Sequence, residues 1–252
     1  MQLALTNSIS GQYPRTDARM QPVLEILAHH LPDSALSWLE RTVRDAADTH
    51  AFDRDVFLIA FGSAARHVGT APVPLTSDDA RLLHLCAQDA EYGDSPHRRA
   101  SRSDEIVRTA LLQFAAERIS AAEVEMLLEE CFRLGDTRER EAVLRTLPLL
   151  PRPERFLSIA IEACRSHVQP VFEAIACDNT YPASHFPDLN FNQMVLKAVF
   201  TGVALKRIVN LSARITPDLA RMAESYASER RAAGRNVPAD INLIIPVAMS
   251  TQ

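Results

Sequence analysis

Residues 185–205 have the sequence HFPDLNFNQMVLKAVFTGVAL, and this stretch is the clearest evidence for a helical fold. Asp188 is suited to cap a helix, and the residues after it place apolar side chains on two sides of that helix. One side holds Phe191, Met194, Val195, Ala198, Gly202 and Leu205, and the other holds Leu196, Val199 and Val203. A helix that is apolar on nearly all sides is normally buried, so we expect residues 188–205 to lie inside the protein.

A narrow polar stripe follows the same predicted helix, formed by Asn190, Gln193, Lys197 and Thr201, with Asn192 and His185 near its N-terminal end. Buried polar groups need hydrogen-bond partners, which leaves two interpretations open. In the first, the stripe is an internal network in which Lys197 pairs with a carboxylate such as Glu173 or Glu229. In the second, the stripe lines a ligand pocket, where Lys197 contacts an anionic or carbonyl group and the amides bind polar edges.

Start signals for helices recur along the chain, while alternating β-branched runs are nearly absent. The predicted starts are Asp33 or Ser34, Asp53, Thr76 with Asp79, Ser103 or Asp104, Ser120 with Glu123, Asp136 with Glu139, Pro153, the stretch after Pro170, and Thr216 with Pro217. The predicted stops and turns are Gly69 with Pro72 and Pro74, Asn210, Gly234, and Pro238 before a last apolar segment. Residues 91–102 are polar and charged, and we expect them to form an exposed loop.

These signals predict an all-α protein with about ten short, separately capped helices joined by short turns. We expect an irregular α-α superhelix, in which HEAT-like helical hairpins stack on one another. The sequence has no strict repeat of fixed period, so a closed multi-helix bundle is the alternative. Residues 1–252 are predicted to form a single helical domain, with residues 91–102 as the best internal boundary.

Composition excludes several classes of protein. The chain has 252 residues, of which 47% are hydrophobic and 23% charged, a balance typical of a soluble globular protein. The 7 glycines are scattered singly, so no glycine-rich loop is available to hold a phosphate or dinucleotide, and we predict no cofactor. The net charge of −5 argues against a general nucleic-acid binder.

The chain also lacks the sequence marks of secretion and membrane insertion. No stretch of about 18 apolar residues occurs, and the N-terminal region has no leader pattern. The cysteines Cys86, Cys131, Cys164 and Cys177 lie far apart in apolar patterns, so we interpret them as reduced core residues. The predicted location is therefore the cytoplasm.

No motif identifies a catalytic or metal-binding residue. The 8 histidines form no HExxH motif and no ligand spacing with carboxylates, and no serine lies in a GxSxG elbow. The sequence therefore predicts no catalytic residue and no metal site. The charged stretch with Arg98, Arg99 and Arg102 is most simply a solvated surface.

Near the C-terminus, the helix after Pro217 carries an apolar stripe that ends close to Arg230. Arg230 is suited to bind the last carbonyls of this helix and to complement its dipole. A functional alternative is that Glu229, Arg230 and Arg235 line the same pocket as Lys197, with arginine recognising a carboxylate or phosphate. The sequence leaves both interpretations open.

The same region resembles the EboA family, which consists of small helical proteins from bacterial ebo gene clusters. The resemblance rests on His185-Phe186-Pro187-Asp188, Phe191-Asn192-Gln193, Val195-Leu196-Lys197-Ala198, Arg207-Ile208, Tyr226, Glu229-Arg230 and Ala233-Gly234-Arg235. The residues shared with the family are His185, Asp188, Asn192, Gln193, Lys197, Arg207 and Arg230, and this favours the pocket interpretation of the stripe.

The resemblance implies an accessory protein in the making or export of secondary metabolites. Its implied partners are a prenyltransferase-like membrane protein, a TatD-like hydrolase, a sugar-phosphate-cyclase-like enzyme and a phosphatase-like protein, and it implies no settled reaction for this component. We therefore expect a non-catalytic module that binds a small metabolite or a partner protein, with peripheral approach to a membrane partner. The alternatives are a pathway enzyme that uses Lys197 or His185 as acid or base, and a scaffold for the other proteins.

Overall fold

The computed structural model describes residues 20–46, 52–74, 76, 79 and 101–245, and in this part of the chain the prediction of an all-α fold is confirmed. The α-helices are α2 (Met20–His30), α3 (Asp33–Ala46), α4 (Arg54–Val68), α6 (Ser103–Arg118), α7 (Ala121–Leu134), α8 (Thr137–Thr146), α9 (Leu157–Arg165), α10 (Gln169–Ala176), α11 (Tyr181–His185), α12 (Asp188–Thr201) and α13 (Pro217–Ala232). Short 3₁₀ turns follow several of them: η1 (Leu147–Leu149), η2 (Pro153–Phe156), η3 (Leu205–Arg207), η4 (Leu211–Arg214) and η5 (Ala239–Leu243).

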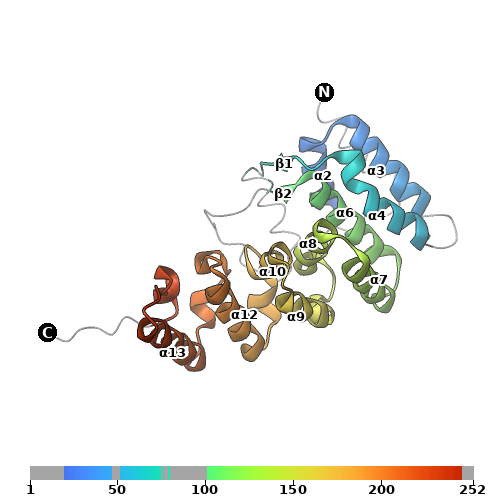
Figure 1. The fold of residues 1–252 in the computed structure, drawn as a ribbon. Helices are drawn as coiled ribbons and strands as arrows, with labels where there is room; N and C mark the ends of the chain where they lie inside the picture. The colour runs from blue at the N-terminus through green and yellow to red at the C-terminus, as the bar shows by residue number, and fades with distance from the viewer. Residues whose placement is uncertain (1–19, 47–51, 75, 77–78, 80–100, 246–252) are drawn as a thin grey trace.

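The helices are stacked in the order of the chain (Figure 1). Helices α2, α3 and α4 lie at one end, α8 packs against both α6 and α10 in the middle, and α12 and α13 lie at the other end. Most of the close helix pairs are neighbours or next-but-one neighbours in the chain, such as α3 with α4, α6 with α8, and α8 with α10. The stack is elongated, while a regular HEAT-like superhelix stays a prediction.

Many of the predicted helix ends are confirmed by their hydrogen bonds. The Asp53 side chain accepts a bond from the Val56 amide at 3.0 Å, and Thr216 caps α13 through the Leu219 amide at 3.1 Å. Complete capping boxes join Ser120 with Glu123 and Asp136 with Glu139. Left-handed glycines follow three helices at Gly69, Gly202 and Gly234, where a residue with a side chain would be strained.

Several local predictions need correction. Asp188 is the first residue of α12 and makes no capping bond, because Pro187 holds the cap position. Residues 101–102 are a strand, β2 (Ser101–Arg102), which pairs antiparallel with β1 (Pro72–Val73), so the predicted loop ends earlier. Thr76 and Asp79 do exchange the expected capping bonds, while the helix predicted after them and residues 91–100 lie outside the described part.

One apolar core runs along the stack, and its largest fully buried aromatic side chains are Phe57, Phe114, Phe156, Phe172, Tyr181 and Phe191. The described cysteines are free thiols: Cys131 and Cys177 are buried, and Cys164 is half-buried. None of the described helices is long and apolar enough to cross a membrane.

Candidate functional site

A pocket with a volume of about 310 Å³ lies between α9, the loop after α9, and the N-terminal half of α12. Its lining is formed by Ile161, Cys164, Arg165, His167, Phe186, Asn190, Gln193, Met194 and Lys197. Three of these residues, Asn190, Gln193 and Lys197, belong to the polar stripe that the sequence singles out. The stripe therefore lines a pocket from one side, and α9 supplies the opposite wall.

The lining combines an apolar surface with cationic and amide groups. Ile161, Phe186 and Met194 supply apolar side chains, while Arg165, His167 and Lys197 bring cationic or protonatable groups. Within the described structure, no carboxylate lines this pocket. Pockets of this kind hold an apolar ligand body while a few polar groups orient the ligand.

Lys197 is bound to the C-terminal end of α9. Its Nζ donates to the carbonyl oxygen of Cys164 at 2.7 Å and to that of Ser166 at 2.6 Å, and it lies 4.5 Å from the centre of the Phe172 ring. The last carbonyls of a helix lack partners within the helix, so the ammonium group satisfies them and complements the helix dipole. Burial lowers the pKa of Lys197.

The expected pairing of Lys197 with Glu173 or Glu229 is not what the structure shows. Glu173 accepts hydrogen bonds from Arg207 and Gln169 instead, and Glu229 is exposed on α13. The two carbonyls that replace them lie 31 and 33 residues before Lys197, so no local pattern marks them as partners. Lys197 thus holds α12 against the end of α9.

The polar stripe is more exposed than we expect for a helix that is apolar on nearly all sides. Gln193 and Thr201 are exposed, and Asn190 and Lys197 are half-buried. Leu189 and Phe200, also on α12, are 66% and 58% exposed, so the expectation of a fully buried helix is wrong. The residues of the first apolar side are buried as predicted from Phe191 to Ala198, because that side packs into the core.

The thiol of Cys164 contributes an apolar surface to the pocket. Burial raises its pKa to about 12. At neutral pH such a thiol stays protonated and is a weak nucleophile. Cys164 is therefore suited to contact the ligand by packing rather than to react with it.

The other predicted residues on and before α12 lie outside this pocket lining and contact the protein itself. The His185 ring packs against the Tyr181 ring with centres 4.7 Å apart. Asp188 accepts a bond from Arg214 at 3.1 Å, and Asn192 donates to the Thr216 hydroxyl at 3.0 Å. These contacts position α11 and α12 around the pocket.

The predicted arginines further along the chain are also engaged elsewhere. Arg207 forms ion pairs with Glu173 and Asp178, which joins η3 to the C-terminal end of α10. Arg230 donates to the carbonyl oxygen of Asn236 at 2.7 Å, just after α13 ends. Glu229 and Arg235 are exposed, and neither they nor Arg230 line the pocket beside Lys197.

Sequence reasoning missed Arg214, which fixes one edge of the pocket. Its guanidinium donates to the carbonyl oxygens of Pro182 and Ala183 and, at 2.7 Å, to that of Phe186. The same group stacks over the Phe191 ring, 4.6 Å from its centre. Arg214 thereby holds the end of α11, which places the Phe186 side chain in the pocket wall.

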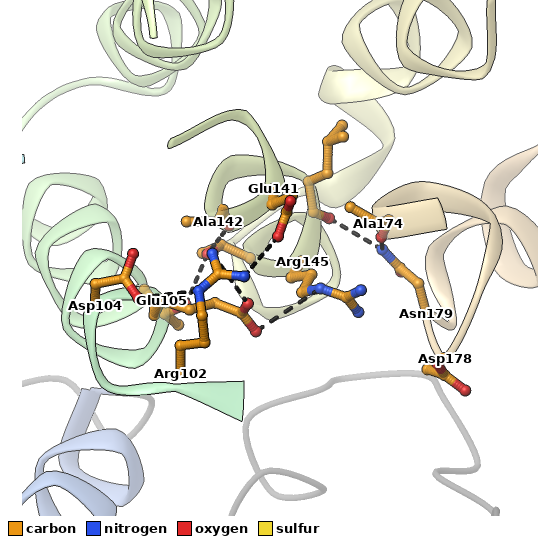
Figure 2. A network of polar contacts seen from close by, with 12 residues as sticks. Arg102, Asp104, Glu105, Glu141, Ala142, Arg145, Ala174, Asp178 and Asn179 are labelled. Carbon is orange, nitrogen blue, oxygen red and sulfur yellow. Dashed lines mark hydrogen bonds and ion pairs between the residues drawn. The ribbon is translucent and has the colours of Figure 1, made fainter. Parts of the chain in front are cut away.

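A second polar cluster was also missed, and it lies between α6 and α8 (Figure 2). Arg102 donates through Nε to Asp104 at 3.1 Å and through Nη1 to Glu141 at 2.8 Å, and its Nη2 is 3.9 Å from Glu105. Its side chain is only 16% exposed, so the interpretation of Arg102 as part of a solvated surface is wrong. The sequence shows the charge of Arg102, but it does not show that Glu141 on α8 lies beside it.

The rest of this cluster links further helices. Arg145 on α8 lies 3.8 Å from Glu105 on α6, and the amide of Asn179 donates to the carbonyl oxygens of Leu144 and Ala174 (Figure 2). Its charges are paired within the protein, as buried charges generally must be. We therefore interpret the cluster as a connection between helices and take the pocket as the candidate functional site.

Comparison with known proteins gives one family. The family model described as "Metabolite traffic protein EboA" matches residues 20–245. No curated protein and no solved structure matches the chain. Among the described residues, no group of three or more histidine, cysteine, aspartate or glutamate side chains is placed to hold a metal ion.

Proposed function

The chain belongs to the EboA family of metabolite traffic proteins, and from this premise we propose that it binds a small metabolite in the pocket beside Lys197 without changing it chemically. Carrying a metabolite requires a site that holds it reversibly. The pocket meets that requirement because it has an apolar wall, a few orienting polar groups and a volume suited to a small molecule.

The main observation in support of this proposal is that α9 and α12 line one pocket together. The sequence predicts Asn190, Gln193 and Lys197 as ligand-binding candidates, and all three line the same cavity. The remaining candidates, such as Asn192 and Arg207, are proposed to support this site by positioning α12 and η3.

The wider role proposed here follows the family. The protein would act in the cytoplasm as an accessory component of a pathway that makes or exports secondary metabolites. It would receive the metabolite from, or pass it to, the other proteins of an ebo gene cluster, including a peripheral encounter with a membrane partner. We propose no nucleic-acid partner and no cofactor.

The geometry gives less support to an enzyme that uses Lys197 or His185 as acid or base. Lys197 donates to two backbone carbonyls, which gives its ammonium group a structural role at the end of α9, although burial lowers its pKa. His185 is not among the residues that line the pocket. The scaffold alternative finds some support in the elongated stack, which offers a long surface to partner proteins.

Binding to the pocket can be tested with N-phenyl-1-naphthylamine, a neutral apolar dye whose fluorescence rises when it leaves water. We expect saturable binding to the purified chain with one site per molecule. The Gln193→Trp variant should lose most of this binding, because a bulky ring at this exposed lining position fills the pocket without altering the core. The measurement is a fluorescence titration of both proteins.

A matched variant controls for effects of a surface tryptophan. Arg221→Trp places the same ring at an exposed position of α13 that does not line the pocket, and it should bind the dye like the unmodified chain. Circular dichroism would verify that both variants are folded. Absence of saturable dye binding, or equal binding by Gln193→Trp and Arg221→Trp, would contradict the proposed function.

A further inference from the structure

We infer that the pocket selects an amphiphilic organic anion, with its carboxylate, phosphate or sulfonate head beside Arg165 and Lys197 and its apolar body against Ile161 and Met194. This inference rests on the proposed function and adds the chemical class of the ligand. It makes the pocket specific for charge as well as for shape.

The first argument is the charge of the lining. Arg165 and Lys197 are cations, and His167 becomes one when it is protonated, while no carboxylate of the described residues lines the cavity. Two carboxylates of neighbouring elements are already paired, because Glu173 binds Arg207 and Asp188 binds Arg214. The positive charge at the pocket therefore has no acidic counterpart in its own wall, and an anionic ligand would supply one.

The second argument is the hydrogen-bonding capacity of Lys197. An ammonium group has three N–H donors, and the carbonyl oxygens of Cys164 and Ser166 accept two hydrogen bonds from Nζ. Because Lys197 also lines the pocket, its remaining donor is suited to a ligand oxygen. An anion there would offset the burial that lowers the pKa of this lysine.

The third argument concerns the body of the ligand. Besides the charged groups, Ile161, Phe186 and Met194 present apolar surface to the same cavity. Apolar side chains in the same cavity as two cations favour a ligand that is apolar except at its head.

Two dyes with the same ring system test this inference. 8-Anilinonaphthalene-1-sulfonate has the body of N-phenyl-1-naphthylamine and adds one sulfonate group. We expect the sulfonate dye to bind about tenfold more tightly in low salt, since a charge-assisted hydrogen bond contributes about that factor. The advantage should shrink as salt is raised, because the arginine and the pocket mouth are exposed to solvent.

Two arginine variants locate the charge that is responsible. Arg165→Gln should weaken binding of the sulfonate dye about threefold to tenfold and should affect the neutral dye less, because that dye carries no charge for the guanidinium to bind. Arg221→Gln removes another exposed arginine, which lies outside the pocket lining, and should change neither affinity. We expect dodecanoate and dodecyl phosphate to displace the sulfonate dye and dodecanol not to displace it. This result would show that the pocket prefers an anionic head group to a neutral one of the same chain length.

The outcomes separate this inference from the proposed function. If the neutral dye binds in the pocket and the sulfonate dye binds no more tightly, the inference is overturned and the proposed function stands. Equal losses in Arg165→Gln and Arg221→Gln would also overturn the inference, as would sulfonate binding that persists in Gln193→Trp. If neither dye binds to the unmodified chain, the proposed function fails as well.

Discussion

The two lysines of the chain show how the same residue type acquires different roles from its surroundings. Lys197 is half-buried and donates to two carbonyls at the end of α9, whereas Lys206 is exposed on η3. Hydrogen bonds that involve a charged group contribute more to stability than bonds between neutral groups, and their loss leaves buried acceptors unpaired. The structural role of Lys197 and its place in the pocket wall are therefore compatible, since one ammonium group serves both.

We expect Lys197→Met to lower the free energy of unfolding by about 2 kcal/mol, because the carbonyl oxygens of Cys164 and Ser166 lose their donor. Lys206→Met is the matched control, and a change at that exposed position should stay within about 0.5 kcal/mol. Urea unfolding at neutral pH measures both. Equal stability of the two variants would show that Lys197 does not stabilise the end of α9.

At the scale of elements, the C-terminal part of the stack is joined by arginines that reach between segments. Arg207 on η3 binds Glu173 on α10 and Asp178 just after it, and Arg214 on η4 binds the end of α11. Burial alone raises the pKa of Glu173, but hydrogen bonds from Arg207 and Gln169 outweigh it and hold the pKa below its ordinary value. The ionised form of Glu173 is thus the one that stabilises the fold.

This lowered pKa predicts how stability depends on pH. In the unfolded chain Glu173 takes up a proton near its ordinary pKa of about 4.3, and in the folded chain it does so only at lower pH. Its contribution is therefore complete above pH 4.3 and is lost as the pH falls through the folded value. Glu173→Gln should show a shallower loss of stability below about pH 4.5 than the unmodified chain.

Urea unfolding between pH 3 and pH 7 provides this measurement. Glu224→Gln removes an exposed glutamate of α13 and serves as the control for the change in net charge. Its pH dependence should follow that of the unmodified chain. If Glu173→Gln and Glu224→Gln have the same slope below pH 4.5, the ion pair with Arg207 does not contribute in the way proposed here.

At the scale of the whole molecule, the helices in the middle of the stack contact more neighbours than helix α13 does at one end. Helices α6 and α8 pack against several others, including each other, whereas the main neighbour of α13 is α12. In proteins built from stacked units, each unit is stabilised chiefly by its neighbours, so the ends open at lower free energy than the middle. The pocket lies between α9 and α12, on the side of the stack toward this less constrained end.

Native-state hydrogen exchange should reveal this gradient. We expect the amides of α13 to be protected at least tenfold less than those of α6 and α8, because fewer helices must separate for α13 to open. The comparison uses amides in the interior of each helix, where the backbone bonds are equivalent. Uniform protection from α6 to α13 would instead indicate a single cooperative unit, as in a closed bundle.

Local signals in the sequence predict much of this fold because the interactions behind them span only three or four residues. The capping boxes at Ser120 and Asp136, and the glycine after α13 at Gly234, mark helix ends by such bonds. Asp188 is one exception, since a proline occupies the position that its side chain was expected to fill. The polar stripe was visible for the same reason, because helical spacing alone places Asn190, Gln193 and Lys197 on one side.

Sequence patterns alone predict that this protein is helical, where most of the described helices begin and end, and which side of α12 carries the polar candidates. The contacts follow only from the packing of the helices: Lys197 binds the end of α9, Arg165 shares its pocket, and Arg102 binds Glu141 on α8. The physical reason is the separation of the partners. These contacts join residues about 30 to 40 positions apart, and they form only when the helices stack.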